Sequence, residues 1–86
     1  MDPVIEMTRN RFAGRASKAR LPWYAKLMHN AATPNEIYLA ANMVYFAIAS
    51  TNAREEFTAK EVLQMEMECS DLREFPGVTI LGDQKR

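Results

Sequence analysis

The sequence predicts an all-α fold, a small compact bundle of three to five helices around a central helix at about residues 34–51. Apolar residues make up 48% of its 86 residues, enough for one core that buries roughly three fifths of the unfolded chain's surface. Two helix-capping motifs and apolar positions at helical spacing support this class. An alternative within the same class adds one short C-terminal β segment at VTIL, residues 78–81.

The central helix is predicted to begin at the sequence TPNE. Thr33 can cap the helix, Pro34 suits its first position, and Glu36 completes a capping box. Beyond it, apolar residues form two stripes on opposite faces, Ile37, Ala41, Val44 and Ile48 on one and Leu39, Met43 and Phe46 on the other. We expect the remaining helices to cover both stripes, and a stripe left uncovered to form an interface.

A further helix is predicted after Thr58, where Glu61 completes a second capping box. Its continuation LQMEMEC, residues 63–69, also alternates with the period of a strand, but these residue types favour a helix. Its expected apolar arc consists of Val62, Leu63, Met65, Met67 and Cys69. Glu66 lies inside this arc, so its carboxylate should be paired, reach water at the edge of the arc, or lie at a partner surface.

The N-terminal third is predicted to hold two helices. Asp2 followed by Pro3 is typical of a helix start, and the pattern continues to about residue 20 despite Gly14. Pro22 then breaks or restarts the chain, and about two turns follow as far as Asn30. We therefore expect residues 1–86 to form a single domain with a flexible tail at 82–86.

Charge is unevenly distributed although the net charge is zero. Residues 7–35 carry six cations and no acid, namely Arg9, Arg11, Arg15, Lys18, Arg20 and Lys26, whereas residues 36–83 carry nine acids. With aromatic residues interleaved at 9–29, the basic segment could bind nucleic acid. A weaker form of this hypothesis is a helix-turn-helix with 70–75 as recognition element. The basic segment could equally contact the acidic part of its own fold.

Few residues in the sequence are suited to catalysis. His29 and Cys69 lie forty residues apart, and the three glycines form no phosphate-binding loop. The acids at 61, 66, 68 and 71 lack the spacing of a calcium loop. The sequence therefore predicts no enzymatic activity, no cofactor and no metal site.

A small binding protein is the predicted function, an adaptor, regulator or inhibitor that occupies the surface of a protein partner. Six methionines and several aromatic residues supply interface-type side chains, and the candidate contacts are Tyr38, Asn42, Tyr45 and Glu66. The alternative is the nucleic-acid-binding regulator described above, and a homodimer is compatible with either.

Cytoplasmic localisation without membrane association is expected from three features of the sequence. Residues 1–10 lack a secretory pattern, and the longest apolar run, 37–49, is too short to span a bilayer. Cys69, the single cysteine, suits a reducing compartment.

Overall fold

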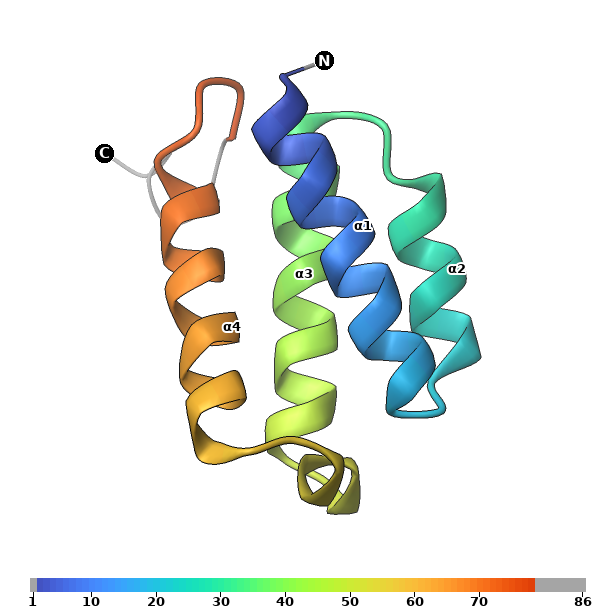
Figure 1. Cartoon of the computed structure of the whole chain (residues 1–86). Helices are drawn as coiled ribbons and strands as arrows, with labels where there is room; N and C mark the ends of the chain where they lie inside the picture. The colour runs from blue at the N-terminus through green and yellow to red at the C-terminus, as the bar shows by residue number, and fades with distance from the viewer. Residues whose placement is uncertain (1, 79–86) are drawn as a thin grey trace, which may run out of the picture.

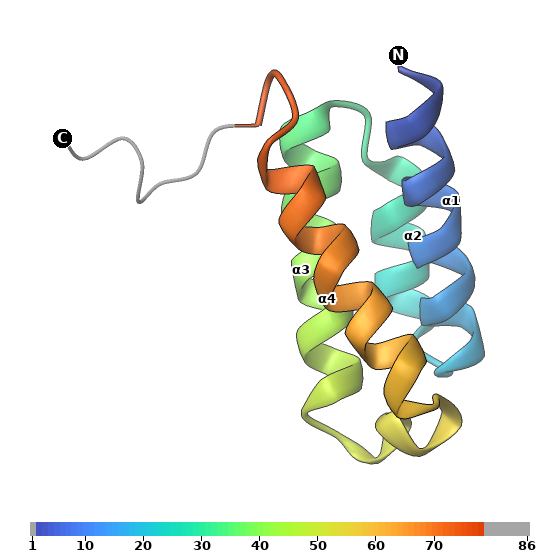
Figure 2. The same cartoon turned by 60° about the vertical axis from the view of Figure 1, so that its left-hand side comes forward.

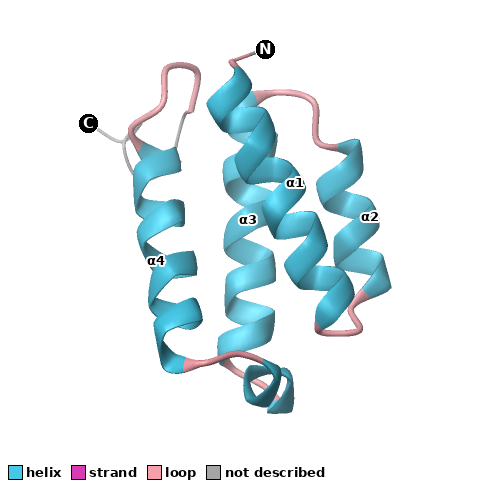
Figure 3. Cartoon of the chain, in the orientation of Figure 1, coloured by secondary structure: helices cyan, strands magenta, loops and turns pink. Residues whose placement is uncertain are grey.

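The computed structural model describes residues 2–78, which form four α-helices, one central and three packed against it (Figures 1 and 3). These are α1 (Pro3–Lys18), α2 (Pro22–Asn30), α3 (Pro34–Ala49) and α4 (Ala59–Arg73), with a short 3-10 helix η1 (Asn52–Glu56) between α3 and α4. The predicted all-α bundle is confirmed, and no strand occurs within residues 2–78. Most of the VTIL segment and the predicted tail at 82–86 lie outside the described residues.

Both predicted capping boxes are formed. At α3, the Thr33 hydroxyl accepts a hydrogen bond from the Glu36 N–H at 3.2 Å, and the Glu36 carboxylate accepts one from the Thr33 N–H. At α4, Thr58 and Glu61 make the same reciprocal pair, at 3.1 and 2.8 Å. These contacts satisfy backbone donors that have no partner inside the helix, which is why both helices begin where the sequence indicates.

The central helix ends two residues earlier than predicted, at Ala49. Thr51 caps the following 3-10 helix instead, since its hydroxyl accepts a hydrogen bond from the Ala53 N–H at 3.2 Å. The 3-10 helix η1 was not predicted, because its five residues are all at least partly exposed and carry no apolar periodicity.

The segment at 63–69 is helical, so the preference for helix over strand is confirmed. α4 continues without interruption to Arg73, and residues 70–73 are therefore its last turn. The helix-turn-helix arrangement needs a separate helix at 70–75, which this continuity rules out.

The turn between α1 and α2 contains a residue in the left-handed region, Arg20, with φ of 62°. The Leu21 N–H donates to the Ala16 carbonyl at 2.9 Å, and the Arg20 N–H donates to the Ser17 carbonyl at 3.0 Å. This is the Schellman pattern that closes a helix, and the position of Arg20 usually holds glycine.

Replacing Arg20 with glycine is expected to raise the free energy of unfolding by about 0.5–1 kcal/mol, because glycine adopts this conformation without a Cβ clash. Urea denaturation of the variant checks this. Ser17→Gly, at a right-handed helical position in the last turn of α1, should instead lower stability by roughly 0.5 kcal/mol. Equal effects of the two substitutions would contradict the assignment.

The core lies between α3 and the other three helices. α3 contacts α1, α2 and α4, with α4 on one side and α2 on the other in Figure 1, and with α4 in front of it in Figure 2. The first predicted stripe of α3 is fully buried, at 0% exposure for Ile37, Ala41, Val44 and Ile48. Equally buried side chains meet it from the other helices, namely Phe12 of α1, Met28 of α2 and Met65 of α4.

The second stripe of α3 remains uncovered. Leu39 is 49% exposed, Met43 41% and Phe46 61%. The expectation that other helices cover both faces is thus wrong, because α1, α2 and α4 pack around the buried stripe and its two flanks. Within residues 2–78 no further helix is left for the opposite side.

Candidate functional site

An apolar surface runs along the outer sides of α2 and α3, and we call it the α2–α3 face. On α3 it follows from the spacing i, i+4 and i+7, which places three apolar side chains on one side of the helix. On α2, Trp23 is 64% exposed and meets the Tyr24 ring edge to face at 5.2 Å between centroids. The face consists of Tyr24 and Leu27 from α2 and Leu39, Met43 and Phe46 from α3, and Trp23 adjoins it through its contact with the Tyr24 ring.

Two open hollows lie along this face. One, of about 340 Å³, is lined mainly by apolar side chains, among them Leu27, Leu39 and Met43. The other, of about 660 Å³, continues past Leu39 and Met43 to Phe46 and Tyr24. Because they share Leu39 and Met43, the hollows border one ridge of side chains on α3.

The four residues predicted to bind protein lie together. A hollow of about 240 Å³ between α3 and α4 is lined by Tyr38, Asn42, Tyr45 and Glu66, together with Cys69, Ser70 and Arg73. Both tyrosines are half-buried against the core, and Asn42 Nδ2 donates to the Tyr38 carbonyl at 2.8 Å. We call this hollow the tyrosine groove. It adjoins the α2–α3 face, because Asn42 also lines the larger hollow there.

The apolar arc of α4 differs from the predicted one. Leu63 and Met67 are 55% and 54% exposed, and Glu66 is exposed. The acid on the buried side is Glu68, at 6% exposure, among Val62, Met65, Cys69 and Leu72. The sequence contained a signal for this position, since Glu68 lies three residues after Met65 and four before Leu72.

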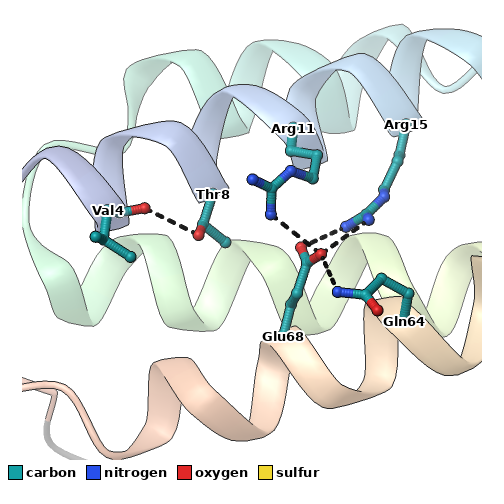
Figure 4. Close-up of polar contacts among 6 residues, drawn as sticks. All are labelled: Val4, Thr8, Arg11, Arg15, Gln64 and Glu68. Atoms are coloured by element: carbon teal, nitrogen blue, oxygen red, sulfur yellow. Dashed lines mark hydrogen bonds and ion pairs between the residues drawn. The ribbon is translucent and has the colours of Figure 1, made fainter.

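Glu68 is held by three side chains (Figure 4). Arg15 of α1 donates through Nη1 to Oε1 at 2.8 Å and through Nη2 to Oε2 at 3.2 Å. Arg11 lies 3.1 Å from Oε2, and Gln64 Nε2 donates to the same oxygen at 2.9 Å. The bidentate pair therefore joins α1 to α4 across 53 residues of sequence.

The pKa of the Glu68 carboxyl reflects opposing effects. Burial alone raises the pKa, but hydrogen bonds from Arg15 and Gln64 and the charges of Arg15 and Arg11 outweigh it, so the pKa lies below its ordinary value of 4.5. Glu68 is consequently ionised at neutral pH although its side chain is only 8% exposed.

The predicted basic segment is divided among several roles. Arg11 and Arg15 contact Glu68, and Lys18 lies 3.9 Å from Glu61, so these three cations face acids of α4. Arg9 donates to the Ala31 carbonyl at the end of α2, at 3.3 Å. Arg20 closes α1, and Lys26 is exposed on α2. The geometry thus favours contact with the acidic part of the same fold over a continuous cationic surface.

His29 and Cys69 lie on different helices that flank α3, His29 exposed on α2 and Cys69 buried on α4. Burial, reinforced by the charge of Glu68, raises the pKa of the Cys69 thiol to about 11, which keeps it protonated and poorly nucleophilic. Across residues 2–78, no three His, Cys, Asp or Glu side chains gather where they could hold a metal ion.

The helices in the described part of the chain are too short or too polar to cross a bilayer. Comparison of the chain with protein-family models, curated proteins and solved structures finds no match.

Proposed function

We propose that this chain is a small non-enzymatic binding protein, an adaptor, regulator or inhibitor, that acts by placing its α2–α3 face on a protein partner. The observation that carries the proposal is the exposed stripe Leu39, Met43 and Phe46 on the helix that organises the core. A central helix is expected to bury its apolar stripes. One left open on a rigid scaffold is typical of an interaction surface.

The exposed area of the face is large enough to support binding. Aromatic side chains cover roughly 150–250 Å² each, so Trp23 and Phe46, at 64% and 61% exposure, offer about 250 Å² together. Leu39 and Met43 add about 150 Å². Removing some 400 Å² of apolar surface from water is worth about 10 kcal/mol before the costs of association are subtracted.

The tyrosine groove supplies a polar border to this surface. Its lining includes Tyr38, Tyr45, Glu66 and Ser70, whose side chains all carry hydrogen-bonding groups. An apolar centre with a polar rim is the usual anatomy of a protein interface. The predicted residues Tyr38, Asn42, Tyr45 and Glu66 thus fit the proposal as rim contacts beside the apolar centre.

A cytoplasmic location is part of the same proposal. Cys69 is a free, buried thiol. Such a cysteine suits a reducing compartment, where disulfide formation does not compete with folding.

Photo-crosslinking in cells tests the proposed surface. A benzophenone amino acid in place of Leu39, 49% exposed on the face, is expected to give discrete protein adducts because a partner covers it. The matched position is Leu63 on α4, which is 55% exposed and lies outside the face. Adducts at Leu39 should exceed those at Leu63 at least tenfold.

Nuclease treatment of the crosslinked sample distinguishes a protein partner from the alternative function, nucleic-acid binding. Adducts at Leu39 that survive nuclease, together with the absence of adducts at Leu63, support a protein partner. Equal labelling of both positions, absence of adducts at Leu39, or adducts that disappear with nuclease would each overturn the proposal.

A further inference from the structure

The estimated area of the α2–α3 face reaches the lower limit for specific, stable interfaces. Two copies meeting through it would remove about 800 Å² of apolar surface from water, twice the estimate for one copy. Apolar atoms make up about 65% of a homodimer interface, so the total buried area would be about 1,200 Å². This value is at the lower end of the range for specific, stable interfaces.

The charges at the border of the face allow identical surfaces to meet. Lys26 and Asn30 share the Trp23 side of α2, and Glu36 borders the smaller hollow beside α3. The Glu36 carboxylate already accepts hydrogen bonds from the Ala32 and Thr33 N–H groups, at 2.9 and 3.2 Å. The tyrosine groove on the other border adds Glu66 and Arg73, one anion and one cation, so cations and anions balance along the border and two copies bring no excess of like charge together.

Met67, an exposed apolar side chain of α4, lies beside like charges. It is followed at i+4 by Asp71 and at i+7 by Glu74, on the same side of the helix. Two copies that met through this side of α4 would bring these acids together, which the α2–α3 face avoids. On α1, Met7 lines a hollow together with Arg11, Glu68 and Asp71, so an interface there would have to remove charged groups from water.

The shape of the face also suits a two-fold pair. Leu39, Met43 and Phe46 form a ridge, and the hollows beside it are lined by apolar side chains of α2 and α3. A two-fold interface requires that a surface complement itself, so that the ridge of each copy can enter a hollow of the other.

We propose that the partner of the α2–α3 face is a second copy of this chain, bound as a two-fold homodimer with Met43 inside the interface. This inference rests on the proposed function, since it names the occupant of the same surface. The dimer buries the stripe of α3 that the fold of one copy leaves in water.

Sedimentation equilibrium of the purified chain tests the dimer over roughly 1–500 µM. The mass is expected to rise with concentration from 9.8 kDa to twice that value. Met43→Glu should raise the dissociation constant at least 100-fold, because each substitution enters a two-fold interface twice. The matched control Met67→Glu, at a site 54% exposed on α4, should leave it within about threefold.

Each outcome decides between the two proposals. A monomeric chain at all concentrations, or equal weakening by both Met→Glu substitutions, overturns the dimer. If the chain is monomeric but the Leu39 position crosslinks to a protein of another mass, only the dimer fails. If the chain is monomeric and Leu39 gives no adduct, both proposals fail. Circular dichroism of both variants excludes unfolding as the cause.

Discussion

Glu68→Ala is expected to lower the free energy of unfolding by about 3–5 kcal/mol near neutral pH. The substitution leaves the Arg15 guanidinium, whose side chain is 14% exposed, without its bidentate partner in a poorly hydrated place. Arg11 also loses a partner, but at 44% exposure it returns to water at little cost. Urea denaturation followed by circular dichroism measures the change.

The double variant Arg15→Met/Glu68→Leu separates the cost of an orphaned charge from the value of the pair. Removing both charges leaves no unpaired ion, so the double variant should lose less stability than Glu68→Ala alone. A loss below about 1 kcal/mol for Glu68→Ala would mean that the pair behaves as an ordinary surface ion pair.

Acid should weaken the same contact. The pKa of Glu68 is lowered in the folded chain, so its contribution is complete above the ordinary value of 4.5 and is lost as pH falls through the folded pKa. Glu68→Gln cannot ionise. The stability difference between wild type and this variant should therefore shrink below about pH 4.5.

Phe12→Ala alone is expected to lower the free energy of unfolding by about 3–5 kcal/mol. Phe12 is 0% exposed and is among the largest fully buried side chains, so its removal leaves a cavity between α1 and its neighbours. Its ring also lies 4.8 Å below the Arg15 guanidinium, which loses a packing partner. Since a domain of this length has a total stability of roughly 4–13 kcal/mol, the variant should be largely unfolded on mild heating.

Two further variants make this prediction decisive. Phe12→Leu keeps most of the volume and should lose less than half as much stability, so it remains measurable if the alanine variant does not fold. Phe46→Ala removes an identical ring from a position 61% exposed, where the change should stay within about 0.5 kcal/mol. Comparable losses at the two phenylalanines would contradict the assigned core.

The local features of the fold were predictable because they depend on short-range chemistry. Thr33 and Thr58 mark the starts of two helices because each hydroxyl accepts a hydrogen bond from the N–H three residues later. Pro22 is the first residue of α2. The stripe from Ile37 to Ile48 is buried because its helical spacing places it on one side. Such signals require no knowledge of how the helices meet.

The tertiary features were harder to predict from the sequence. The sequence marked two apolar stripes on α3, but which one the other helices cover depends on where α1 and α4 dock. For the same reason the apolar arc of α4 was predicted to contain Glu66, whereas the buried acid is Glu68. Only the docked position of α1 brings Arg15 to 2.8 Å from the Glu68 carboxylate. The helical spacing alone placed Tyr38, Asn42 and Tyr45 on one flank of α3, but the presence of Glu66 of α4 in the same groove depends on how the two helices pack.

The order of the helices has a consequence for folding kinetics. Contacts between α1 and α2, α2 and α3, and α3 and α4 join neighbours along the chain, so most pairing requires closure of short loops only. Such topologies reach the native state within microseconds to milliseconds. The bond from Arg15 to Glu68 closes a loop of 53 residues and is expected to form late. Its loss should therefore accelerate unfolding while leaving the rate of folding almost unchanged.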